Sequence, residues 1–204
     1  MTLPASIPQG LEDGRVRDLL ALTFEDFDIR GIAARLARTN RYAGATHWPY
    51  SVATHSVLVS HLCEEYAPAG FGCAGAKLRR QYALAGLLHD IPESFGIGDM
   101  ISPIKRVLPG YRELEDAIVQ QLIPAFPALA LHTDPTVRRA DERAYQLECK
   151  ILRGSWPRRE HTSFECADMN ALEIDLAEWL LESEVSWSRS KFLFLQRYKE
   201  LTNV

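Results

Sequence analysis

Apolar residues recur at intervals of three and four along most of the chain, the spacing of an α-helix with one buried face. Convincing runs that alternate apolar and polar residues, as half-buried β-strands do, are absent. The pattern predicts helices over residues 29–37, 52–62, 79–93, 110–123, 135–151, 171–182 and 190–201, and a short segment that starts at Ser102-Pro103. We therefore predict an all-α fold, a helical bundle preceded by a proline-containing arm.

Residues that favour helix ends support these boundaries. Ser51 is a good N-cap for the helix that contains His55, and Asp134 with Pro135 caps the helix that contains Asp141. Pro92, followed by glycines, ends the helix that starts at Arg79. The polar stretch 40–49 between the first two helices is a glycine-bearing loop.

Composition narrows the function classes. A chain of 204 residues with 47% hydrophobic and 25% charged residues is most simply one globular domain. Its net charge of −4, with no lysine-rich tail, argues against a non-specific nucleic-acid binder. No stretch approaches the roughly 20 apolar residues that cross a bilayer, and no signal peptide is evident, so we expect a cytoplasmic protein. The four cysteines are widely spaced, which argues against thiol zinc sites and a disulfide framework.

Candidate metal ligands stand out against the apolar helical pattern. His89 and Asp90 follow an apolar run at a helix end that Pro92 breaks, where both side chains can reach one cation. His55 lies in the middle of an apolar helix, and Asp141 lies among apolar residues of another, where a buried carboxylate is costly unless it is paired or metal-bound. Two imidazoles and two carboxylates suit Mn²⁺, Co²⁺, Zn²⁺, Fe²⁺ or, less well, Mg²⁺.

Each of these residues also has an ordinary structural interpretation. A single histidine on an apolar helix face is often a core residue, Asp141 can pair with Arg138 or Arg139, and Glu93 can be a solvated helix end. The order His, His-Asp, Asp on three different helices makes coincidence much less probable.

Local sequences around these residues resemble the HD-domain phosphohydrolase superfamily. The similar segments are Asn40-Arg41-Tyr42, Tyr50 to Ser56, Leu88 to Glu93, Gly98 to Lys105 and Val137 to Asp141. They are most similar to the small branch that includes bacterial 5′-deoxynucleotidases and phage-type deoxynucleoside triphosphohydrolases. The resemblance spans about residues 25–155. It implies a single HD domain over 1–204, with this core and the C-terminal helices packed on it.

The resemblance also assigns roles. It implies that His55, His89, Asp90 and Asp141 bind the metal and that Glu93 is the catalytic carboxylate beside the attacking water. Dinuclear relatives need extra histidines between the doublet and the last aspartate, and this chain has only His132 there, so the resemblance implies one metal ion rather than two. Arg41 would bind the phosphate, with Tyr42 beside it where the bacterial deoxynucleotidases carry tryptophan. Asp99 matches a position near the sugar. The loop before Asp99 is one residue longer than in the bacterial deoxynucleotidases. Lys105 is a further phosphate contact or an exposed loop lysine.

These residues predict a metal-dependent phosphohydrolase that acts on a nucleotide, first of all a 5′-deoxynucleotidase. A deoxynucleoside triphosphohydrolase, an alarmone or cyclic-nucleotide hydrolase, and a non-catalytic metal-binding regulatory module stay open as alternatives.

Several other residues have two interpretations each. His47-Trp48-Pro49-Tyr50 is the mouth of the site or an ordinary turn, and Arg158-Arg159 contacts a triphosphate or is a solvated pair. Trp179 and Trp187 pack the final helices or form a homo-oligomer interface. His61, six residues after His55, points away from the face of His55 and is not expected to bind metal.

Overall fold

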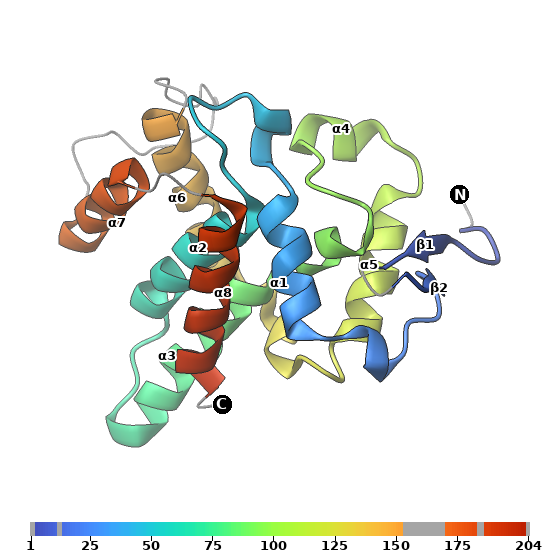
Figure 1. The fold of residues 1–204 in the computed structure, drawn as a ribbon. Helices are drawn as coiled ribbons and strands as arrows, with labels where there is room; N and C mark the ends of the chain where they lie inside the picture. The colour runs from blue at the N-terminus through green and yellow to red at the C-terminus, as the bar shows by residue number, and fades with distance from the viewer. Residues whose placement is uncertain (1–2, 12–13, 153–169, 183–185, 203–204) are drawn as a thin grey trace.

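The structure, a computed structural model, describes residues 3–11, 14–152, 170–182 and 186–202. In this part of the chain the α-helices are α1 (Ile29–Arg38), α2 (Val52–Tyr66), α3 (Gly72–Leu88), α4 (Ser102–Val107), α5 (Tyr111–Leu122), α6 (Pro135–Leu152), α7 (Ala171–Glu182) and α8 (Trp187–Thr202) (Figure 1). Four short 3-10 turns join them: η1 (Phe24–Asp26), η2 (Arg41–Gly44), η3 (Ile91–Phe95) and η4 (Pro127–Leu131). The all-α prediction is confirmed.

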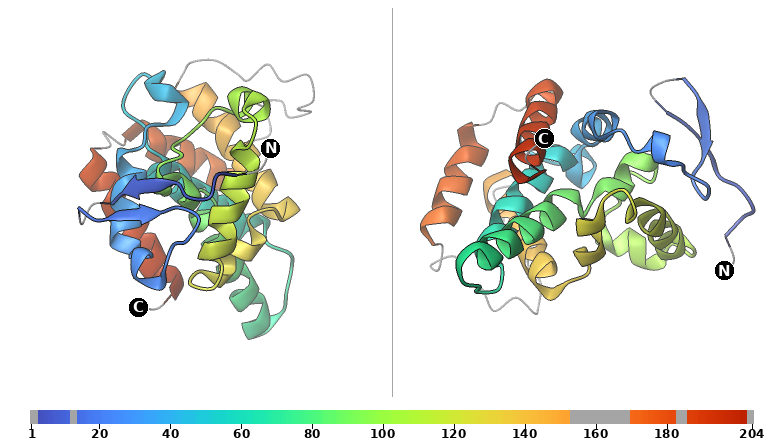
Figure 2. Two further views of the ribbon diagram at one scale, coloured as in Figure 1. Left: turned by 90° about the vertical axis from the view of Figure 1, so that its right-hand side faces the viewer. Right: turned by 90° about the horizontal axis from the view of Figure 1, so that it is seen from below.

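The prediction for the N-terminal arm needs a correction. Its residues form a small antiparallel hairpin of β1 (Pro8–Gly10) and β2 (Val16–Asp18), in which Gln9 pairs with Arg17. The hairpin lies at the opposite side of the molecule from α7, beside α5 (Figures 1 and 2). Strands of three residues are too short to show alternation in the sequence.

Helix α2 is the centre of the fold and contacts α1, α3, α6 and α8. Residues 52–60 of α2 are all buried, including the polar side chains of Thr54, His55, Ser56 and Ser60. The hydroxyls find partners in the core: Ser56 donates to the carbonyl of Val52 at 2.9 Å, and Ser60 to that of Ala83 at 2.8 Å. His55 is therefore placed inside the core, where its ring nitrogens require specific partners.

Helices α2 and α3 pack closely because Gly86 has no side chain. A Cβ at Gly86 would lie 2.6 Å from Cys63 Sγ and 3.0 Å from the carbonyl oxygen of Val59. Gly86 is two residues before the end of α3, so this contact fixes where His89 and Asp90 emerge beside α2.

Helix boundaries agree with the sequence at most N-termini. The Ser51 hydroxyl accepts from the Thr54 amide at 3.2 Å, and Asp134 accepts from the Thr136 amide at 2.8 Å, so both predicted N-caps are confirmed. The predicted helix 79–93 is wrong at both ends, since α3 starts at Gly72 and stops at Leu88. Pro92 then lies in η3, a separate turn that carries Glu93. Among the described helices, none has the length and apolar character needed to span a membrane.

Candidate metal centre

The loop before α2 carries Arg41 and Tyr42 and is held at the start of that helix. Asn40 and Ser51 form an isolated antiparallel bridge, and the Arg41 amide donates to the carbonyl of Tyr50 at 2.9 Å. The two ends of the loop are thereby held together at the start of α2, one turn before His55. Tyr42 has φ 57° and ψ 26°, a left-handed conformation that costs a residue with a Cβ about 1–3 kcal/mol.

The four predicted metal ligands come together from α2, the turn that follows α3, and α6. His55 Nε2 lies 3.2 Å from Asp141 Oδ1 and 3.5 Å from Asp90 Oδ2. His89 Nε2 lies 3.3 Å from Asp90 Oδ2 and 3.9 Å from Asp141 Oδ1. Two ligand atoms at 2.0–2.2 Å from one cation are separated by roughly 3–4 Å, depending on the coordination geometry. These distances fit a common ion.

Hydrogen bonding leaves both Nε2 atoms available to that ion. His55 Nδ1 is 2.6 Å from Glu148 Oε1, and His89 Nδ1 is 2.7 Å from the carbonyl oxygen of Gly86. A carbonyl can only accept, so the Nδ1 of His89 carries the proton and its Nε2 lone pair faces the carboxylates. Both Nε2 atoms are buried and make no hydrogen bond in the structure. Unpaired buried nitrogens directed at two carboxylates are the donor set that a divalent cation requires.

The two carboxylates have different surroundings. Asp90 is largely covered, with its side chain 18% exposed, and although burial opposes its ionisation, His89, His55 and Arg41 lower its pKa below the usual value. Asp141 was expected to be a buried aspartate, but its side chain is 47% exposed. Asp141, in the second turn of α6, is therefore the more exposed of the two carboxylates. The alternative in which Asp141 pairs with Arg138 or Arg139 finds no support among its described contacts, which are with His55 and His89.

Glu93 is buried beside this cluster rather than solvated at a helix end. The residue is 4% exposed, and its Oε1 accepts from Lys105 Nζ at 3.2 Å while its Oε2 is buried without a hydrogen bond. Burial, with the nearby charge of Asp90, raises its pKa well above the usual value, although Lys105 and Arg41 oppose the rise. Lys105 also lies 3.1 Å from Glu115 Oε1 in α5. Lys105 is thus attached to the catalytic candidate by an ion pair.

Arg41 is adjacent to the cluster from the other side. Its Nη1 is 3.5 Å from Asp90 Oδ2, and its Nε is 3.3 Å from Glu148 Oε2. The backbone amide of Tyr42 donates to Asp99 Oδ2 at 3.1 Å. The structure therefore brings Arg41, Tyr42 and Asp99 together near the predicted metal ligands.

Glu148 is the residue that sequence reasoning missed. It is fully buried on α6 and contacts Arg41, Tyr42, Tyr50 and His55, which are 93 to 107 positions earlier in the chain. One signal was available: Glu148 is seven residues after Asp141, so two helical turns place both acids on the same face of α6.

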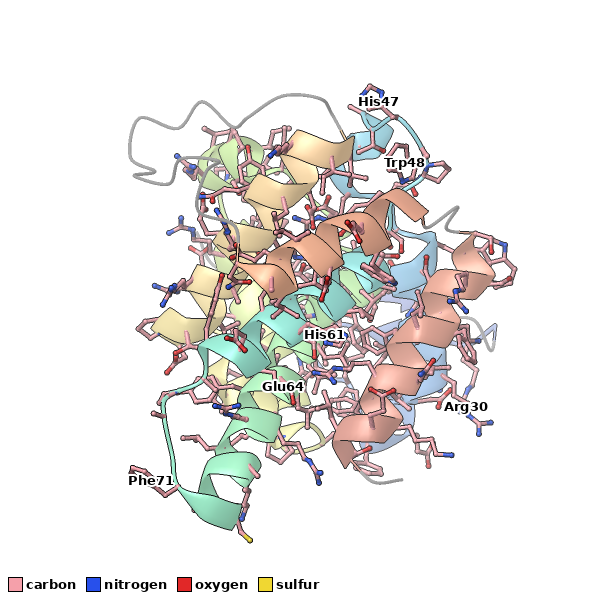
Figure 3. The ribbon with its side chains drawn as sticks, turned by 90° about the vertical axis from the view of Figure 1, so that its left-hand side faces the viewer. Arg30, His47, Trp48, His61, Glu64 and Phe71 are labelled. Carbon is pink, nitrogen blue, oxygen red and sulfur yellow. The ribbon has the colours of Figure 1, made fainter. Side chains whose placement is uncertain are left out.

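The remaining candidates lie elsewhere. His61 lies near Glu64 on α2 (Figure 3), and it is not among the described residues whose ligand atoms group with those of His55. His47 and Trp48 lie together in the loop before α2 (Figure 3), whereas Tyr50 is buried against Glu148 and is therefore not an open aromatic at the mouth of the site. Trp187 is 50% exposed beneath the guanidinium of Arg38. Arg158 and Arg159 lie outside the described residues.

Comparison with known proteins gives a family of bacterial proteins. No family model matches the chain. An uncharacterized protein of Rhodobacter capsulatus is 36% identical over 152 residues, which cover 72% of this chain and 73% of that protein. The chain belongs to the same family as this protein. The uncharacterized protein YfdR of Escherichia coli is 33% identical over 94 residues, which cover 46% of this chain and 44% of YfdR.

One solved structure is more distantly similar. The cyanophage S-2L HD phosphohydrolase (DatZ), bound to dA and one catalytic Zn²⁺ ion, has a TM-score of 0.43 and 19% identity. The match covers 85% of this chain and 96% of that chain. A sequence identity and a TM-score this low do not indicate a shared activity.

Proposed function

We propose that this protein is a metal-dependent phosphohydrolase of the HD type that acts on nucleotides, and that it releases phosphate from deoxynucleoside monophosphates. The observation that carries the proposal is the convergence of two buried imidazole Nε2 atoms, both without a hydrogen bond, on Asp90 and Asp141. The similarity of the local sequences to HD-domain phosphohydrolases supports it further.

One divalent cation would be held by the two imidazoles and the two carboxylates. His55, His89 and Asp141 each offer a ligand atom, and these atoms lie within 4.8 Å of one another. Asp90 Oδ2 is near both imidazoles and completes the set. When bound, such a cation supplies charge stabilisation to the phosphoryl group and lowers the pKa of water.

The chain's own groups perform the remaining tasks. Glu93, with a raised pKa and an unpaired Oε2, holds the attacking water and accepts its proton. Arg41 neutralises the phosphate oxygens with its planar guanidinium. The water oxygen forms a bond to phosphorus, the bond from phosphorus to the 5′ oxygen breaks, and that oxygen leaves with a proton as the nucleoside alcohol.

Charge favours a monophosphate over a triphosphate. Among the described residues, two cationic side chains form ion pairs with Asp90 or Glu93. Arg41 contacts Asp90 and is shared with Glu148, and Lys105 contacts Glu93 and is shared with Glu115. A triphosphate carries about four negative charges near neutral pH and requires more cations than this to balance them. Asp99, beside Tyr42, is the candidate contact to the sugar.

A substrate screen tests the proposal. Purified protein is assayed against all nucleoside and deoxynucleoside mono- and triphosphates with Mn²⁺, Co²⁺, Zn²⁺ and Mg²⁺ in turn. We expect inorganic phosphate from deoxynucleoside monophosphates in the presence of metal and none from an Asp90→Ala variant. Release of triphosphate would instead identify a deoxynucleoside triphosphohydrolase. No turnover of any nucleotide with any of the metals would contradict the proposal.

A further inference from the structure

A single buried carboxylate connects the candidate metal ligands to the candidate phosphate site. Glu148 is 0% exposed, and its two oxygens divide four partners between them. Oε1 lies 2.6 Å from His55 Nδ1 and accepts from the Tyr50 hydroxyl at 2.9 Å. Oε2 accepts from the Tyr42 hydroxyl at 2.5 Å and lies 3.3 Å from Arg41 Nε. A buried carboxylate is stable only when it is compensated in this way.

We propose that Glu148 is a positioning residue: one carboxylate fixes both the orientation of His55 toward the metal and the place of Arg41 at the phosphate. The inference rests on the proposed function, because it takes His55 as a ligand and Arg41 as the phosphate contact. Neither His55 nor Arg41 has another described carboxylate partner that is fully buried.

On the metal side, the contact between Glu148 and His55 selects the ring nitrogen that binds. The carboxylate accepts a hydrogen bond from Nδ1–H, so the proton stays on that nitrogen, and Nε2, which faces Asp90 and Asp141, is the nitrogen that binds the metal. The same bond prevents rotation of the ring inside the core. Loss of a carboxylate that supports a metal-binding histidine typically weakens metal affinity by about 10–100-fold.

On the phosphate side, Glu148 holds Arg41 and Tyr42 as a pair. The guanidinium of Arg41 lies 5.4 Å from the centre of the Tyr42 ring. Tyr42 is in a left-handed backbone conformation, and its hydroxyl bond to Glu148 and its amide bond to Asp99 both favour that conformation. Removing the carboxylate leaves Arg41 with Asp90 as its remaining described ion-pair partner, so the guanidinium loses its fixed place.

The chain offers a closely matched control for a test of this role. Glu173 is also a buried glutamate with an arginine and a tyrosine: it accepts from Arg143 Nε at 2.8 Å, from Arg143 Nη2 at 2.7 Å and from the Tyr66 hydroxyl at 2.7 Å. These groups connect α6 to α7 and the end of α2, and they include no metal-ligand candidate. Glu173→Gln therefore removes a comparable buried ion pair without touching His55.

The experiment measures metal affinity without turnover. Metal-free wild type, Glu148→Gln and Glu173→Gln are titrated with Zn²⁺ against a chromophoric chelator. We expect Glu148→Gln to bind Zn²⁺ about 10–100-fold more weakly, and Glu173→Gln to bind as the wild type does even if its melting temperature falls. Equal Zn²⁺ affinity in Glu148→Gln and wild type would overturn the role toward His55.

Two further readouts cover the remaining cases. Imidazole ¹⁵N spectra of the Zn²⁺-loaded wild type test the ring orientation even if Glu148→Gln does not fold. A proton on Nδ1 of His55 is expected, and metal on Nδ1 would overturn the inference.

Binding of inorganic phosphate to the Zn²⁺-loaded proteins tests the role of Glu148 toward Arg41. Weaker phosphate binding in Glu148→Gln is expected, and unchanged binding would refute the role toward Arg41. A wild type that binds Zn²⁺ but hydrolyses no nucleotide would overturn the proposed function and leave the role toward His55 standing.

Discussion

Glu93→Gln separates chemistry from metal binding at this site. The substitution keeps the shape of the side chain and removes its ability to accept a proton. Burial and Asp90 raise the pKa of Glu93 well above its usual value, and the amide oxygen of a glutamine of the same shape can still accept from Lys105 Nζ. Lys105, its ion-pair partner, keeps Glu115 at 3.1 Å. We therefore expect a folded variant that still binds metal.

The expected loss is in turnover. A positioned general base contributes about 10²–10⁴-fold to the rate, so kcat should fall by this factor, which corresponds to roughly 3–5 kcal/mol in the activation free energy. The assay measures phosphate release from deoxynucleoside monophosphates at saturating metal, together with the metal Kd and the melting temperature. Glu113→Gln, on the exposed side of α5, is the control and should keep the wild-type rate. A Glu93→Gln kcat within about tenfold of wild type would refute the assignment.

Three further predictions follow from the same geometry. Arg41→Lys keeps the charge but loses the planar fork, so kcat/KM should fall by about tenfold or more; unchanged steady-state kinetics would remove Arg41 from the phosphate site. Burial and Arg41 oppose protonation of His55, but Glu148 and Asp141 outweigh them and raise its pKa to about 10 in the metal-free protein. Below that pH a metal must displace a proton from His55. A pH-stat titration near pH 8 should therefore record about one proton released per metal ion bound, and the metal affinity should fall as the pH is lowered. A titration without proton release would contradict this. Gly86→Ala places a Cβ 2.6 Å from Cys63 Sγ and should cost about 1–3 kcal/mol in urea unfolding; an unchanged unfolding midpoint would show that α2 and α3 can separate freely.

Local signals predicted the helices because their causes are local. Ser51 and Asp134 cap α2 and α6 with their own side chains, which the sequence shows directly. The predicted start of α3 is too late because residues 72–78 are mostly exposed and carry no apolar periodicity. Its end was placed too late because Pro92 disfavours a helical conformation in the residue before it, so Glu93 belongs to a separate turn.

The candidate site was predictable as a set of residues but not as a network. The metal-ligand candidates were recognisable because polar side chains on apolar helices are unusual, and the structure brings them together. The exposure of Asp141 depends on how α6 sits against α2, which no local pattern reports. Glu148 acquires its partners only through tertiary packing, since all four are more than 90 positions away in the chain.

The central claim is that one divalent cation, held by His55, His89, Asp90 and Asp141, is required for hydrolysis of a nucleotide. The most direct test strips the protein of metal and titrates it with Zn²⁺ or Mn²⁺ while phosphate release from deoxynucleoside monophosphates is recorded. We predict that activity rises from background and saturates at one ion per chain, and that Asp90→Ala neither binds the ion tightly nor turns over. Full activity in the stripped protein, or a wild-type rate in Asp90→Ala, would contradict the account.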